Sequence, residues 1–194
     1  MRFKLQFPPF LVLAVLFFSS CAFSQVVPSA QRRSLPLELG GGISSFDVDW
    51  GHGRMLGGTL WGDWYPEQLP AFLHGLGIEA EARDISFNRG THPSNFREDT
   101  GGGGPIYTWR HYQNFQPYVK YLIEFGSIDF RISSIPTYTH DTRQVYSPGI
   151  GFEYHVFKGV WARADYEYQF WPNLFGQTLN PQGFTFGATY RFFR

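Results

Sequence analysis

The most reactive combination of side chains in the sequence is His140 next to Asp141, within the segment Thr139–Arg143. A histidine oriented by a carboxylate can act as a general base. The same residue types are also common in solvated turns, where they form local hydrogen bonds. We can assign no nucleophile to this pair. We therefore predict no catalytic residues and keep base catalysis by His140 and Asp141 as an alternative.

Two groups of acidic residues could supply oxygen ligands to a hard cation. They are Asp47 with Asp49 and His52, and Glu98 with Asp99. Neither group has the spacing of a dedicated metal site. The run Gly101–Gly104 lacks the strand, helix and lysine that accompany a phosphate loop, so we interpret it as a flexible hairpin tip. The sequence therefore predicts no metal site and no cofactor.

Charged residues recur at every second position in the most regular segments. In the segment 160–171 one face is apolar, whereas the other carries Arg163, Asp165 and Glu167. A period of two is typical of a β-strand. Faces of this kind hold nine residues of both signs: Glu79, Glu81, Arg83, Lys120, Glu124, Glu153, Arg163, Asp165 and Glu167. Because buried charges must pair to offset desolvation, we expect them to form a network inside a barrel, joined by His155.

Eight such segments divide most of the chain. They are 35–45, 56–65, 76–83, 105–111, 115–125, 150–156, 160–171 and 184–193. The joins near 112 and 157 are short and that at 66–73 is longer, whereas the remaining connections are long and rich in turn residues: 46–54, 88–104, 126–144 and 172–181. The prediction is an all-β fold, an eight-stranded antiparallel up-and-down transmembrane β-barrel.

A soluble barrel with an apolar interior has the same strand period, so the contents of the two faces must distinguish it from a membrane barrel. The faces opposite the charges carry aliphatic and aromatic residues, which suits lipid flanked by aromatic girdles. We expect the lipid-facing positions of the last segment to be Phe184, Phe186, Tyr190 and Phe192. Its interior positions would then be Thr185, Thr189 and Arg191.

The N-terminus has the layout of an export signal, because two basic residues precede an apolar run at 7–18 and small residues follow it. We predict three parts: a signal peptide at 1–24, an N-terminal segment at 25–34 and a barrel domain at 35–194. Lipidation of Cys21 is an alternative way of processing this end. The 16 basic and 16 acidic residues balance and form no basic patch, which argues against a nucleic-acid partner.

Three segments together resemble the small outer membrane β-barrel superfamily, which includes the membrane domain of outer membrane protein A. These segments are Phe115–Lys120, Pro148–Tyr154 and Gly187–Arg194. The resemblance implies an outer-membrane location in a Gram-negative bacterium. It also implies that the last strand is recognised by the barrel insertion machinery. It supplies no shared catalytic residues.

The function expected from these observations is a structural or surface-interaction role without catalysis. The barrel would be monomeric, in contact with outer-membrane lipids and filled by polar side chains, and the loops 88–104 and 126–144 would carry its specificity. One alternative is a small porin with a narrow polar lumen. Another is a barrel enzyme that modifies lipid A or cleaves proteins through His140 and Asp141.

Overall fold

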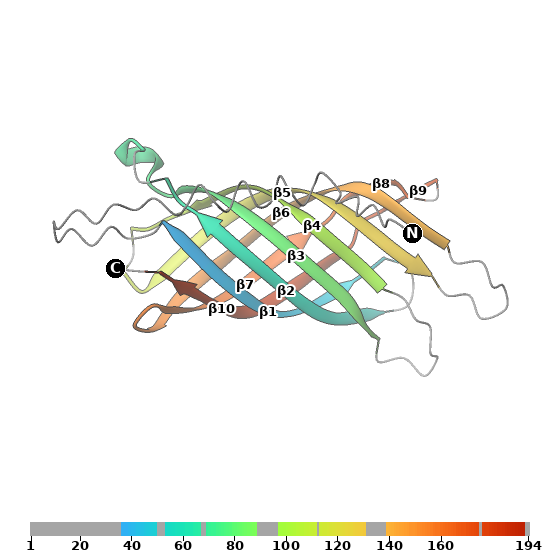
Figure 1. The fold of residues 1–194 in the computed structure, drawn as a ribbon, viewed down its shortest axis with the longest axis horizontal. Helices are drawn as coiled ribbons and strands as arrows, with labels where there is room; N and C mark the ends of the chain where they lie inside the picture. Colours follow the sequence, from blue (N-terminus) through green and yellow to red (C-terminus); the bar gives the residue numbers. More distant parts are fainter. Residues whose placement is uncertain are drawn as a thin grey trace, which may run out of the picture. The chain divides into compact units, whose positions relative to one another are not determined.

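The alternating segments form a closed antiparallel barrel in a computed structural model (Figure 1). The structure describes residues 36–49, 53–66, 69–88, 97–111, 113–130, 139–174 and 176–192. Its barrel strands are β1 (Leu37–Asp47), β2 (Arg54–Trp64), β3 (Leu76–Asn88), β4 (Arg97–Thr108), β5 (Phe115–Phe130), β6 (Thr139–Phe157), β7 (Val160–Tyr168) and β10 (Gln182–Arg191). The predicted fold class is confirmed.

The strands follow one another around the barrel in chain order, and β10 closes the circle by pairing with β1. In this seam Glu38 lies opposite Arg191, and Asp47 lies opposite Gln182. We call the end of the barrel that holds Glu38 and Arg191 the terminal end, and the opposite end the loop end. Among the described helices, none is long and apolar enough to cross a membrane.

Three small elements lie outside the barrel wall. The 3-10 turn η1 (Ala71–Leu73) lies in the predicted long join at the terminal end. The segment predicted as a plain loop at 172–181 instead contains a small hairpin of β8 (Trp171–Leu174) and β9 (Gln177–Leu179). A bridge between Tyr146 and Phe170 joins the start of this hairpin to β6. The loop prediction was wrong here because Pro172 and Asn173 have turn chemistry but flank buried apolar residues.

The strands are longer at the loop end than the sequence predicted. The predicted loop 88–104 overlaps β4, which begins at Arg97, and the predicted loop 126–144 overlaps both β5 and β6. Beyond the lipid a strand can be polar on both faces, so its composition does not differ from that of a loop. The connections that remain, 89–96 and 131–138, lie outside the described residues.

The glycine run at 101–104 is a strand segment of β4 and not a hairpin tip. Gly102 lies opposite Glu124 on β5, and a Cβ atom at Gly102 would lie 2.3 Å from the carbonyl oxygen of Ile123. A Cβ atom at Gly104 would lie 2.1 Å from the carbonyl oxygen of Tyr121. These glycines are therefore required by the close approach of neighbouring strands, whereas the sequence pattern indicated flexibility.

The outer wall carries exposed apolar side chains at the positions that alternate with the interior ones. On β10, Phe184, Phe186 and Tyr190 are 39%, 62% and 49% exposed. Phe192, just past the end of β10, is half-buried. The intervening Thr185, Thr189 and Arg191 are buried. This wall has the composition of a lipid-facing surface.

Candidate functional site in the barrel interior

Lys120 lies at the centre of a cluster of charges inside the barrel. Its Nζ atom lies close to three carboxylates, those of Glu79 at 3.0 Å, Glu81 at 2.5 Å and Glu167 at 2.9 Å. The lysine comes from β5, the first two acids from β3 and the third from β7. Glycines on the strands between them leave the necessary room; a Cβ atom at Gly149 on β6 would lie 2.9 Å from Cε of Lys120.

Arg83 extends the cluster toward the loop end. Its guanidinium donates to both carboxylate oxygens of Glu167, at 2.9 and 2.8 Å, and also to Glu81. Its Nε donates to the hydroxyl of Thr59 at 3.1 Å, and the ring of Phe46 lies 4.1 Å from the guanidinium carbon. A planar guanidinium with this bidentate contact is held in one orientation.

Arg163 extends the cluster toward the terminal end. Its partners are three carboxylates, those of Glu79 at 2.6 Å, Asp63 at 3.2 Å and Asp165 at 3.2 Å. The rings of Trp61 and Tyr118 each lie 4.6 Å from its guanidinium carbon. Stacked rings and three acids surround a single charge, so the arginine has no access to bulk water.

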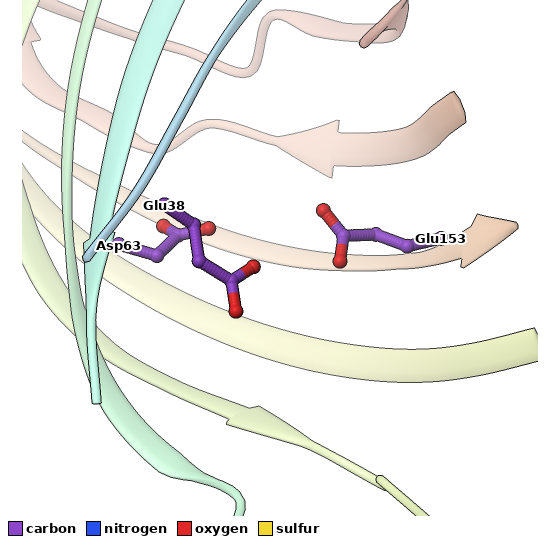
Figure 2. Close-up of side chains that lie close together, drawn as sticks. All are labelled: Glu38, Asp63 and Glu153. Carbon is purple, nitrogen blue, oxygen red and sulfur yellow. The ribbon is translucent and has the colours of Figure 1, made fainter. Parts of the chain in front are cut away.

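At the terminal end a triplet of buried carboxylates, Glu38, Asp63 and Glu153, brings one oxygen of each within 4.8 Å of the others (Figure 2). Such a group could ligate a metal ion in principle. Here, however, Arg191 bonds both Glu38, at 2.8 Å, and Glu153. Arg110 bonds Glu38 at 2.9 Å. Since arginines already neutralise the triplet, a cation would have to displace a guanidinium group.

Apolar and aromatic clusters lie on either side of the charges. At the loop end are two clusters: Phe46, Val48, Met55 and Ile85, and Ile128, Val145, Trp171, Leu174 and Leu179. Toward the terminal end Tyr65, Ile106 and Tyr118 form a third. The hairpin β8–β9 contributes to the second of the loop-end clusters, and the ring of its Trp171 occupies the space that a side chain at Gly126 would fill. The charges are thus covered by apolar side chains at the loop end, whereas the ion pairs of Glu38 with Arg191 and Arg110 lie at the terminal end.

The structure places all nine charged residues of the expected network inside the barrel, each buried. Four further charged residues, which the sequence analysis did not connect with this network, are also buried: Glu38, Asp63, Glu98 and Arg191. The first two lie on glycine-rich strands with weak alternation, and the third lay in a predicted loop. The expected member His155 is half-buried and contacts Trp161, with ring centroids 5.1 Å apart.

The candidate catalytic pair does not lie in a loop, because Thr139–Phe157 is strand β6. The Asp141 carboxylate bonds Arg143, two positions along the same strand, at 3.2 Å. The side chain of His140 lies outside the described residues. The predicted loop location of this pair is therefore wrong.

The two candidate cation groups are also separated. Glu98 faces the interior, whereas Asp99 points outward and bonds Arg97 at 2.9 Å. In the other group, Asp47 accepts a hydrogen bond from the backbone N–H of Asp49 at 3.3 Å. His52 lies outside the described residues. Among the described residues, Glu98 and Asp99 therefore do not form a common site.

Comparisons with known proteins agree with this architecture. A family model described as outer membrane protein beta-barrel domain matches residues 10–192. Neisserial surface protein A is similar in structure, with a TM-score of 0.62 and 12% identity over 80% of this chain and 96% of that one. OprG from Pseudomonas aeruginosa has a TM-score of 0.57 and 12% identity over 81% and 96%. Ail, the attachment invasion locus protein of Yersinia pestis, has a TM-score of 0.53 and 16% identity, and the match covers 80% of this chain and 96% of Ail. A search of curated proteins finds no match.

Proposed function

Because this chain belongs to the outer membrane protein beta-barrel domain family, we propose that it is a non-conducting outer-membrane barrel with a structural and surface-contact role. The observation that carries the proposal is an ion pair across the interior. Arg83 on β3 bonds Glu167 on β7 at 2.8 Å, and these strands lie four places apart in a circle of eight. Side chains therefore meet across the full width of the barrel.

The filled interior also argues against the alternative of a small porin. A conducting lumen needs a continuous file of water, whereas an eight-stranded barrel is just wide enough for its side chains to fill. The Lys120 side chain is fully buried by its carboxylate partners. The apolar clusters at the loop end add a second barrier, because an ion would have to leave water to pass them.

Planar-bilayer recording tests this proposal. The refolded protein is expected to give no steady openings at moderate voltage, while heat-modifiable migration on gels verifies that the inserted protein is folded. A porin of known conductance, reconstituted in the same way, serves as the positive control. Steady openings of the folded protein would contradict the proposal and support the porin.

The loop end is the extracellular end in this proposal, since small outer-membrane barrels have short periplasmic turns and longer extracellular connections. The outer wall of this end carries charged instead of apolar side chains near Arg97, which pairs with Asp84 at 2.8 Å and with Asp99 at 2.9 Å. An exposed ion-pair cluster belongs in water or at lipid headgroups. The strand ends above it, with the connections at 89–96 and 131–138, would make the surface contacts. Two neighbours carry names of this kind, a surface protein and an attachment protein.

Cysteine labelling of intact cells tests the orientation. A cysteine replacing Asp99 should react with a membrane-impermeant maleimide, because Asp99 points outward at the loop end. The control is Asn114→Cys in the exposed turn between β4 and β5, at the terminal end. It should react only after the outer membrane is disrupted. The reverse result would exclude surface contact through the loop end.

We also propose that β10 is the segment that the barrel insertion machinery recognises, and that the barrel is monomeric. The support is that β10 closes the barrel against β1 and presents Phe184, Phe186 and Tyr190 outward. Replacing Tyr190 by Asp should lower the amount of folded barrel in cells without abolishing refolding in detergent. Equal loss in both settings would indicate a stability defect instead.

A further inference from the structure

Several oxygen atoms in the loop half of the interior have no hydrogen-bond partner among the described residues. Glu98 is only 2% exposed, yet neither of its carboxylate oxygens has a partner. Glu124 is fully buried; one of its oxygens accepts a hydrogen bond from Ser147, and the other has no partner. The buried hydroxyl of Thr100 also has none. Buried oxygens in this state are costly and call for an explanation.

These residues lie together on two paired strands. On β4 and β5, Thr100 lies opposite Gly126, and Glu124 lies opposite Gly102. The Glu124 side chain leans over Gly102, because its Cγ atom lies 3.0 Å from the position that a Cβ atom there would take. Glu98 lies opposite Ile128, on the same inward face of β4 as Thr100 and two positions further toward the loop end. The ring of Trp171 covers Gly126 and so lies beside the group.

Buried carboxylates also outnumber buried cations in the interior. Among the described residues the buried carboxylates are nine: Glu38, Asp63, Glu79, Glu81, Glu98, Glu124, Glu153, Asp165 and Glu167. The buried cations are four: Arg83, Lys120, Arg163 and Arg191. Arg83 lies opposite Thr100 in the pairing of β3 with β4, but Glu167, Glu81 and Thr59 engage its nitrogens. Among the described residues, neither Glu98 nor Glu124 therefore forms an ion pair with a cation.

We propose that Glu98, Glu124 and Thr100 bind a hard cation of the calcium class inside the barrel, beneath Trp171. Carboxylate and hydroxyl oxygens are the ligands that such ions prefer. The ion would supply both the missing partners and the missing charge. The terminal-end triplet differs, because arginines already neutralise it. The competing arrangement is a proton shared between the two glutamates, and the experiment must separate the two.

Terbium luminescence in the refolded full chain tests the site, since Tb³⁺ replaces Ca²⁺ and is excited by a nearby tryptophan. Excitation of tryptophan should give saturable Tb³⁺ emission that Ca²⁺ displaces. Glu98→Gln should raise the half-saturating Tb³⁺ concentration about tenfold or more, because the site loses one of its two carboxylates. The matched control is Asp99→Asn, which removes a charge from the adjacent, outward-facing position and should bind Tb³⁺ as the original chain does.

Thermal unfolding with Ca²⁺ or EDTA gives a second measurement. Ca²⁺ should raise the Tm of the original chain and of Trp171→Phe, while the latter loses most of the Tb³⁺ emission. If Glu98→Gln fails to fold, Thr100→Val takes its place and should reduce the Ca²⁺ response. Equal emission from the original chain and Glu98→Gln would place the ions on the outer wall and overturn the proposal. A Tm that is insensitive to Ca²⁺ would overturn it in favour of the shared proton.

Discussion

Arg163 and Arg97 have similar partners on opposite sides of the same barrel wall. Arg163 lies inside, 1% exposed, with Asp63, Glu79 and Asp165 around it. Arg97 lies outside, 53% exposed, with Asp84 and Asp99. In water such pairs contribute little, because the solvent already stabilises each charge. In the interior, removal of one partner leaves the others desolvated and uncompensated. The comparison shows that burial, and not the number of bonds, sets the energetic weight of an ion pair here.

The largest expected effect is that of Arg163→Ala. Its three carboxylates would keep their burial and lose their shared counterion, which should lower the free energy of unfolding by about 3–5 kcal/mol. Urea unfolding of the protein in lipid vesicles, followed by tryptophan fluorescence, measures the change. A loss as small as that of an exposed pair would show that water reaches the interior.

An arginine placed on the outer wall should have the next largest effect. Phe186 is 62% exposed on β10. Its neighbour Gly187 lies opposite Arg163 in the pairing of β10 with β7. Phe186→Arg would put a guanidinium into lipid at nearly the level where Arg163 is tolerated inside. We expect a loss of about 2–4 kcal/mol in vesicles. Phe186→Leu is the control and should cost far less. Equal stability of the two variants would place this position outside the lipid.

A smaller loss is expected from Gly102→Ala. The new methyl group would collide with the backbone at Ile123, and overpacking of this kind costs roughly 1–3 kcal/mol. Gly101→Ala is the matched control, because the nearest atom to its Cβ, the carbonyl oxygen of Glu81, is 3.9 Å away. Urea midpoints of the two variants should therefore differ. The interpretation of this run as a flexible tip predicts no difference.

The smallest effect is expected from Arg97→Ala. Its pairs with Asp84 and Asp99 are exposed, so the urea midpoint should remain within experimental error of the original value. The same measurement at high salt should also show no change. A clear destabilisation would mean that this cluster lies in a water-poor part of the membrane. The boundary between lipid and water would then lie further toward the loop end than Arg97.

The sequence was sufficient to predict the number of barrel strands and the face of each regular strand. Period-two alternation in Val160–Tyr168 follows directly from the different solvents on the two sides of the wall. It was not sufficient for Gly101–Gly104, because a glycine that admits a neighbouring backbone and a glycine in a turn have the same composition. The interior position of Glu98 was not predicted for a related reason, since its strand continues beyond the apolar belt that reveals strands.

Pairing partners could not be predicted from local sequence. Glu167 lies 84 residues from Arg83, and Arg163 lies 100 residues from Asp63. Their contact depends on the strand order, on the shear of the barrel and on small residues on the strands between them. Alternation indicates that a residue faces inward, but it carries no information about which inward residue it meets.

The ion pair between Arg83 and Glu167 has a consequence for the timing of assembly. Strands β3 and β7 are four places apart around the circle, so in an open sheet three strands would separate these side chains. They can meet only when β10 joins β1 and bends the sheet into a ring. Until then this contact contributes nothing to the growing structure, although Arg83 can already bond Glu81 on its own strand. Pairing across the full width of the barrel is therefore a late event of folding, and its free energy is released only in molecules whose eight barrel strands are all in place.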